Sequence, residues 1–174
     1  MEKEKRKIRI QNFLIFTFYF LLLLALDLWS KAAVFDRLSR QQDGSVSVID
    51  GFFRLVAVEN TGAAFGIATG RTYLLIAVSL IALAVIFVVF FFGKVKRRLI
   101  YAALGLFAAG VCGNLYDRIF NDGRVRDFID VVYWPGKHWP AFNIADSMLC
   151  IGVGLLIIST FTERPSQRRA QQRK

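Results

Sequence analysis

The chain carries four long apolar runs, separated by polar and charged stretches. The runs cover residues 13–26, 73–92, 99–115 and 144–161. A helix needs about 17–25 apolar residues to cross the hydrocarbon core of a bilayer. The second run has that length outright, whereas the first has it only if Ile8–Gln11 and Leu28–Trp29 are counted as its ends. The pattern predicts an all-α membrane protein with four transmembrane helices, at about 10–29, 73–92, 99–116 and 143–161.

A signal peptide or a set of soluble core helices would agree less well with these runs. A basic stretch precedes the first run, as in a secretory signal peptide, but large residues continue to its end and no small-residue cleavage pattern follows. Core helices of a soluble protein would carry a polar face, whereas residues 73–92 are almost free of charge. We therefore interpret residues 1–174 as one integral membrane domain.

The polar segment between the first two spans, about residues 30–72, contains a hairpin pattern. Residues 45–49 alternate in polarity, Asp50-Gly51 is a two-residue turn signal, and residues 52–58 indicate a second strand. A second polar segment covers about 117–142. We predict a small β-hairpin or sheet cradle outside the membrane, with an irregular loop as the alternative.

Basic residues gather in three clusters, which four spans would place on one side of the membrane. The clusters are Lys3, Lys5, Arg6, Lys7 and Arg9; Lys94, Lys96, Arg97 and Arg98; and Arg164, Arg168, Arg169, Arg173 and Lys174. The positive-inside rule assigns that side to the cytoplasm. Both termini, including the basic tail 162–174, are then cytoplasmic, and segments 30–72 and 117–142 are extracytoplasmic. The net charge of +10 is consistent with contact with membrane lipids, and we predict no nucleic-acid partner.

Polar residues also gather at the extracytoplasmic ends of the spans. They are Asp27, Ser30 and Lys31 on the first, Asn114, Asp117 and Arg118 on the third, and Asn143 and Asp146 on the fourth. Residues three or four apart share a helix face, so these side chains can converge on one site. An acid at the head of a lipid-bound run is costly to place, which makes Asp146 a functional candidate. Asp127, shortly upstream, is the second.

Several further charged residues fit a simpler interpretation as interfacial side chains that reach water. This group contains Lys31, Asp36, Asp122, Arg124, Arg126 and Asp130. For Asp117 we expect an ion pair within the end of its own helix, and for the lone His138 a surface position.

The residue types available favour acid–acid chemistry. There is no Gly-x-Ser-x-Gly motif, and His138, Cys112 and Cys150 form neither a nucleophile–base pair nor a zinc spacing. We expect the two cysteines to be small buried residues. Two carboxylates that share a proton can activate water and polarise a carbonyl, as in aspartic proteases. A small transporter and an enzyme dependent on Mg²⁺ or Ca²⁺ remain alternatives, although no acid-rich spacing supports a metal; we predict no cofactor.

Four motifs follow one another along the chain. Asp27-Leu28-Trp29-Ser30-Lys31 comes first, then Asn60-Thr61-Gly62-Ala63-Ala64-Phe65-Gly66, then Gly113–Arg118 with Val125–Phe128, and finally Trp139–Ser147. They resemble, in order, the four motifs of the bacterial lipoprotein signal peptidases (signal peptidase II), of which the first is Asp-Gln-x-Ser/Thr-Lys and the second Asn-x-Gly-x-Ala-Phe. The resemblance covers almost the whole chain, and the four motifs together are highly specific.

The resemblance implies an aspartic endopeptidase of the bacterial cytoplasmic (inner) membrane. Its substrates would be diacylglyceryl-modified prolipoproteins, cut just before the lipidated cysteine, and a globomycin-type inhibitor would block it. The implied catalytic pair is Asp127 and Asp146; the implied supporting residues are Asn60, Asn114, Arg118 and Asn143, with Asp27 as a further polar residue of the site. We expect a monomer. The sequence does not assign the shared proton to either acid, although a position near a helix N-terminus favours Asp146 as the ionised partner.

The sequence departs from the family pattern at three places. Leu28 stands where the family usually has Gln, and Tyr116 replaces a commonly aliphatic residue. The connection through residues 119–122 is about one residue longer than usual. Asp127 remains the matching acid, but Asp122 and Asp130 are the neighbours against which it should be tested.

Overall fold

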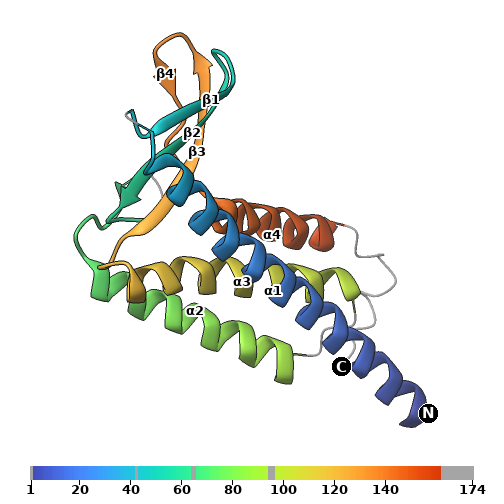
Figure 1. The fold of residues 1–174 in the computed structure, drawn as a ribbon. Coiled ribbons are helices and arrows are strands. Elements are labelled where there is room, and N and C mark those ends of the chain that lie inside the picture. The colour runs from blue at the N-terminus through green and yellow to red at the C-terminus, as the bar shows by residue number, and fades with distance from the viewer. Residues whose placement is uncertain (1, 42, 64–65, 94–96, 162–174) are drawn as a thin grey trace.

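Four long helices lie beneath a small antiparallel sheet (Figure 1). The computed structural model describes residues 2–41, 43–63, 66–93 and 97–161, apart from the side chain of Lys5. The helices are α1 (Glu2–Leu38), α2 (Thr72–Phe92), α3 (Arg98–Phe120) and α4 (Ile144–Phe161). Each is long and apolar enough to cross a membrane, so the prediction of four apolar helices is confirmed. The predicted tail 162–174 and residues 94–96 lie outside the described residues.

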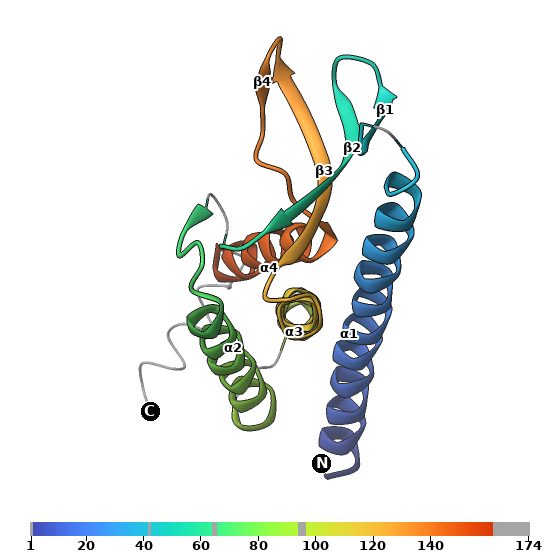
Figure 2. The same cartoon turned by 60° about the vertical axis from the view of Figure 1, so that its left-hand side comes forward.

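Helix α3 occupies the centre of the bundle, between the other three helices (Figure 2). Of its most apolar stretch, 61% is buried, against 11–22% for the other helices. Glycines permit this close packing. A Cβ on Gly110 would lie 2.7 Å from the Ala145 carbonyl of α4, and one on Gly113 would overlap the Asp27 carboxylate of α1.

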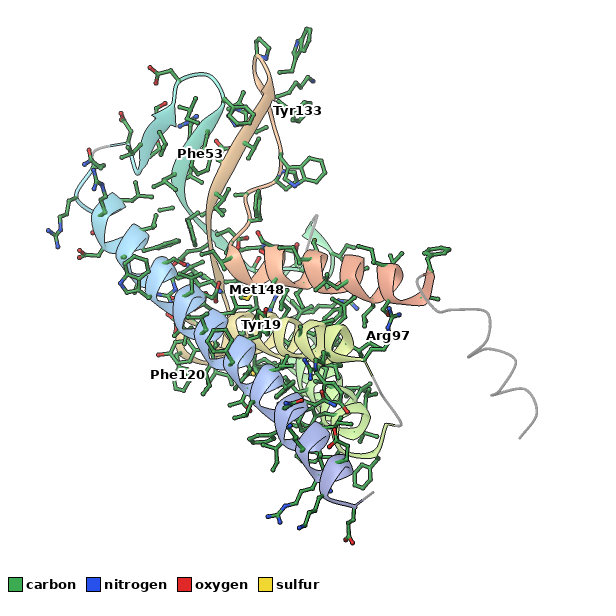
Figure 3. All side chains as sticks on the ribbon, turned by 90° about the vertical axis from the view of Figure 1, so that its right-hand side faces the viewer. Tyr19, Phe53, Arg97, Phe120, Tyr133 and Met148 are labelled. Carbon is green, nitrogen blue, oxygen red and sulfur yellow. The ribbon has the colours of Figure 1, made fainter. Side chains whose placement is uncertain are left out.

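The apolar side chains divide between the helix interfaces and the outer surface. Met148 (Figure 3), only 3% exposed, packs with Leu106 and Ala109 where α4 meets α3. Large apolar residues on the outer faces are half exposed, among them Phe18, Leu22, Leu80, Val85, Phe87, Ile151 and Ile157. Such a surface suits lipid as solvent, because hydrocarbon tails solvate these side chains well.

The sheet contains strands β1 (Ser45–Ile49), β2 (Phe53–Asn60), β3 (Val125–Trp134) and β4 (Lys137–His138), in that order and all antiparallel. The predicted hairpin is confirmed as β1 and β2, with Gly51 at a φ of +71° in its turn. Strand β3, which the sequence pattern did not predict, joins the two polar segments into one sheet that lies at one end of the bundle (Figures 1 and 2).

Two helices extend beyond the predicted spans. Helix α1 continues to Leu38 and α3 to Phe120, so the polar residues at these ends are held on rigid helices rather than on loops. The result is a framework of helix ends and strands around one polar site.

Candidate active site

Asp146 lies in the first turn of α4, where a local sequence pattern fixes its position. The Asp146 backbone N–H donates to Asn143 Oδ1 (3.0 Å), and the Asn143 N–H donates to Asp146 Oδ2 (3.1 Å). This reciprocal pair is a capping box, with an Asn–x–x–Asp sequence in place of the more common Ser/Thr–x–x–Glu. The carboxylate also lies where the helix dipole favours negative charge.

Asp127 lies on β3 and is 2% exposed. Its Oδ2 accepts a hydrogen bond from Asn60 Nδ2 (2.9 Å), and its Oδ1 accepts one from Asn143 Nδ2 (2.7 Å). Opposite it, β2 carries one extra residue between Leu55 and Val58, a bulge of the kind that often redirects side chains beside active sites. Asp127 is therefore held by two amides at an irregular point of the sheet.

Burial raises the pKa of Asp127 from its ordinary 3.8 to about 6. The negative charge of Asp146 adds to the rise, while hydrogen bonds from Asn60 and Asn143 and the positive charge of Lys31 oppose it. Asp127 thus holds a proton over a wider pH range than an exposed aspartate.

Two asparagines connect the acids. Asn143 donates to Asp127 from its side chain and to Asp146 from its backbone. Asn114, on α3, donates from Nδ2 to Asp146 Oδ1 (2.8 Å) and accepts from Asn143 Nδ2 (3.1 Å). Each carboxylate therefore accepts two hydrogen bonds from fixed groups.

A buried charge cluster lies behind the asparagines, centred on Lys31. Lys31 Nζ contacts Asp27 Oδ2 (2.8 Å), Asp117 Oδ2 (3.3 Å) and Asn114 Oδ1 (3.0 Å), and all three charged side chains are fully buried. The interpretation of Lys31 as an interfacial side chain is therefore wrong. The expected ion pair of Asp117 within its own helix end is also wrong, because Asp117 pairs with Lys31 of α1 and with Arg126 of β3.

The two acids of this cluster hold the backbone next to each candidate catalytic acid. Asp27 Oδ1 accepts the N–H of Ala145 (2.8 Å), the residue before Asp146. Asp117 Oδ2 accepts the N–H of Arg126 (3.0 Å), the residue before Asp127. The Lys31 cluster thus joins α1, α3, α4 and β3 directly beneath the two acids. In the sequence, the one signal of this buried cluster was the i, i+4 spacing of Asp27 and Lys31.

Arg118, on α3, is 9% exposed and secures the loop that follows β2. Its Nη2 donates to the Gly62 carbonyl (2.9 Å), and its Nη1 donates to the Asn114 carbonyl (3.3 Å). The Gly62 N–H in turn donates to Asn60 Oδ1 (2.8 Å), which orients the Asn60 amide toward Asp127. Residues 64 and 65 of this motif lie outside the described residues.

A cavity of about 850 Å³ opens onto both acids. Of the seven predicted site residues, five line it: Asn60, Asn114, Arg118, Asp127 and Asp146. Asn143 and Asp27 are fully buried behind it. The rest of its lining is mostly apolar, including Gly62, Phe142 and Ile151, with Glu59, Thr61 and Ser147 as further polar residues. Cys150, which we expected to be buried, is exposed and also lines this cavity.

The two neighbouring acids lie outside the cavity lining. Asp122 occupies a turn with a φ of +48°. Asp130 is 6% exposed and pairs with His138 Nδ1 (2.9 Å) and, more distantly, with Arg54 (3.9 Å), so its interpretation as a water-reaching residue is wrong. Among the described residues, no cluster of three His, Cys, Asp or Glu side chains could hold a metal ion.

Comparison with known proteins places this chain in a family. The model of the signal peptidase (SPase) II family matches residues 19–162. A lipoprotein signal peptidase of Geobacter sulfurreducens is 46% identical over 122 residues, which cover 68% of this chain and 75% of that protein. One of Geobacter metallireducens is 37% identical over 91% of this chain and 97% of its own length. A solved structure of a bacterial membrane enzyme superposes with a TM-score of 0.73 at 32% identity, covering 87% of each chain.

Proposed function

The chain belongs to the signal peptidase II family, and we propose that it is an aspartic-type endopeptidase that cuts diacylglyceryl-modified prolipoproteins just before the lipidated cysteine. Asp127 and Asp146 are the catalytic residues in this proposal. The observation that carries it is the cavity that both acids line, behind which the buried Asn143 donates a hydrogen bond to each carboxylate.

The two acids divide the work of hydrolysis. Asp146, at the N-terminus of α4, is the ionised partner and removes a proton from water as the water oxygen attacks the scissile carbonyl carbon. Asp127, whose pKa is raised to about 6 by burial, is the neutral partner and donates its proton to the carbonyl oxygen. As the tetrahedral intermediate collapses, its nitrogen takes the proton from Asp146 and one of its hydroxyls returns a proton to Asp127. The C–N bond breaks, and the amine leaves in neutral form.

The remaining site residues support these steps. Asn114 and Asn143 fix the positions of the carboxylates, and Asn60 holds Asp127 from the sheet side. Arg118 orders the Gly62 loop along the cavity wall and supplies positive charge near the developing oxyanion. Asp27 acts through the backbone of α4.

The shape of the cavity supports a lipid-bearing substrate. Its lining extends along α4 to Cys150 and Ile151, and Ile151 is 54% exposed on the outer face of that helix. A peptide beside a diacylglyceryl group would keep its acyl chains in the membrane while its scissile bond enters between the helix ends and the sheet. The substrate therefore enters from the lipid.

The apolar helices and the family are those of a bacterial membrane protein. In the orientation that we propose, the sheet and the site face the extracytoplasmic side, and both termini are cytoplasmic. The N-terminal end of α1, with its basic residues, lies at the opposite end of the bundle from the sheet (Figure 1), as the positive-inside rule requires. The enzyme acts as a monomer in this proposal, and a globomycin-type inhibitor blocks its activity.

The test is a gel assay in which the purified enzyme cleaves a diacylglyceryl-modified prolipoprotein. Asp127→Asn and Asp146→Asn should each abolish cleavage while the protein remains inserted and folded. Asp122→Asn is the matched control, since Asp122 lies outside the cavity lining, and it should retain activity; Asp130→Asn should retain at least partial activity. Normal cleavage by either dyad variant would refute the mechanism.

Two further measurements separate this proposal from a metal-dependent enzyme and from a transporter. Activity should persist in a chelator, whereas a Mg²⁺- or Ca²⁺-dependent enzyme would lose it. A transporter would show no cleavage at all, and a precursor without the diacylglyceryl group should be a poor substrate.

A further inference from the structure

A chain of polar side chains crosses all four strands of the sheet. Arg54 of β2 donates from Nη2 to Ser45 Oγ of β1 (3.0 Å), and its Nη1 lies 3.9 Å from Asp130 Oδ2 of β3. His138 of β4 places its Nδ1 2.9 Å and 3.0 Å from the two oxygens of the same carboxylate. We call Ser45, Arg54, Asp130 and His138 the sheet network. None of the four lines the cavity onto which the two candidate catalytic acids open.

Asp130 depends on His138 for its hydrogen bonding. Asp130 is only 6% exposed, and among the described residues His138 makes the only hydrogen bonds to its carboxylate. Arg54 is its direct neighbour across the strands, but a separation of 3.9 Å is too long for a hydrogen bond. A buried carboxylate without a donor is costly. Asp130 therefore holds His138, and β4 with it, against β3.

Strand β4 needs this support because it is short. It consists of Lys137 and His138, both exposed, and pairs with β3 at Trp134 and Val132. Antiparallel pairing of this length supplies few backbone hydrogen bonds and is marginal in water by itself. The side-chain contact between Asp130 and His138 adds a second link between the two strands.

The segment that follows β4 forms a wall of the cavity. The chain runs from β4 back along β3 to the start of α4 (Figure 2), and all four residues of 139–142 line the cavity. Within this wall, Pro140 has no N–H, and Ala141 makes no backbone hydrogen bond with another described residue. The middle of the wall is therefore not held by the sheet.

The two ends of the wall are tied to β3 to different degrees. At the α4 end, Phe142 exchanges hydrogen bonds with Ile129 in both directions (2.9 Å and 3.1 Å). At the β4 end, the Trp139 N–H donates to the Val131 carbonyl (2.8 Å), and the next residue along the chain is His138. The position of Trp139 thus rests on one printed backbone bond and on the contact between His138 and Asp130.

We propose that His138 and Asp130 are positioning residues, which hold the 139–142 wall in place and thereby set the affinity for the peptide substrate. This inference rests on the peptidase function proposed above. The network acts on substrate binding rather than on the chemistry, because the asparagines that hold Asp127 and Asp146 do not belong to it.

The test measures kcat and KM of the full-length enzyme in detergent micelles on a diacylglyceryl-modified prolipoprotein. His138→Ala should raise KM about tenfold, the loss expected for one charge-assisted hydrogen bond, and should change kcat less than about twofold. Asp130→Asn should also raise KM while retaining kcat. The double variant should lose little more than the worse single variant, because both residues act through one contact. Binding of the same precursor to the Asp146→Asn enzyme, with and without His138→Ala, measures the affinity without cleavage.

Matched variants separate this contact from a general loss of structure. An asparagine places its side-chain N–H donors close to the position of histidine Nδ1, whereas a glutamine places them close to that of Nε2. His138→Asn should therefore recover most of the affinity, and His138→Gln should not. Lys137→Ala is the control on the same strand, since the Lys137 side chain makes no hydrogen bond or ion pair among the described residues, and it should leave KM unchanged.

The outcomes distinguish this inference from the proposed function. If the unaltered enzyme cleaves and Asp146→Asn does not, an unchanged KM in His138→Ala would overturn the positioning role alone. A tenfold fall in kcat at constant KM, or equal KM values for His138→Asn and His138→Gln, would overturn it as well. The comparison of these two variants keeps the test decisive if His138→Ala does not fold. Normal cleavage by Asp146→Asn would remove the proposed function and this inference together.

Discussion

Replacing Lys31 with Met removes the cation at the centre of the buried cluster while keeping a side chain of similar length. Lys31 Nζ lies 2.8 Å from Asp27 Oδ2 and 3.3 Å from Asp117 Oδ2, with all three side chains fully buried. Asp117 would retain Arg126 as a partner (2.6 Å), but Asp27 would keep only the Ala145 N–H. One carboxylate is then left buried without a counter-charge.

The expected cost follows from that geometry. Breaking a buried ion pair by removing one partner costs about 3–5 kcal/mol, a large share of the roughly 5–15 kcal/mol that stabilises a typical domain. The same helix supplies a control at the same spacing: Asp36 and Arg40 also form an i, i+4 pair at 2.7 Å, but their side chains are 66% and 74% exposed. Arg40→Met should therefore cost less than about 1 kcal/mol.

The catalytic effect should appear in kcat. Lys31 is absent from the cavity lining but orients Asn114 and, through Asp27 and Asp117, the backbone before both dyad acids. Lys31→Met should lower kcat by at least about tenfold with little change in KM, since misplaced catalytic groups affect the transition state more than substrate binding. The free energy of unfolding in mixed micelles and the kinetics on a lipidated precursor measure the two effects.

A double variant separates stability from positioning. Asp27→Asn added to Lys31→Met removes the stranded charge, so stability should recover in part, while kcat should stay low because the link to Asn114 is still missing. If Lys31→Met proves as harmless as Arg40→Met in both stability and kcat, the cluster does not position the dyad and the reasoning is refuted.

The other predictions concern pH and packing. Activity requires the proton on Asp127, whose pKa is raised to about 6, so kcat/KM should fall as the pH rises through about 6. Asn60→Ala removes a hydrogen bond that favours the charged Asp127 carboxylate, so the fall in kcat/KM should move to higher pH. A fall at the same or a lower pH would contradict the assignment of this titration to Asp127. Gly113→Ala would place a Cβ against the Asp27 carboxylate and should cost about 1–3 kcal/mol of stability. Gly154→Ala is its control, with no atom within 4 Å of the added Cβ; thermal unfolding of the two variants should differ clearly, and equal melting temperatures would rule out the predicted overlap.

The sequence determined the features that depend on local patterns. The four apolar runs became four helices because a segment without charge has few ways to satisfy its backbone in lipid except by helix formation. The Asp50-Gly51 signal marked the hairpin turn, since glycine adopts the positive φ found there without strain. Asn143 and Asp146, three residues apart, formed a capping box for the same local reason.

Only the tertiary structure decided how distant segments meet. Strand β3 was not predicted, because Asp127 and Asp130 are unfavourable in strands and the strand is stabilised by pairing with β2, which is remote in sequence. An interfacial position was expected for Lys31 because burying a lysine without partners is costly, and the sequence does not show which residues will surround it. Asn114, 83 residues away, and Asp117 lie beside it only after α3 packs on α1 across Gly113. A buried charge is stable only when its partners are assembled around it, and that assembly belongs to the fold as a whole.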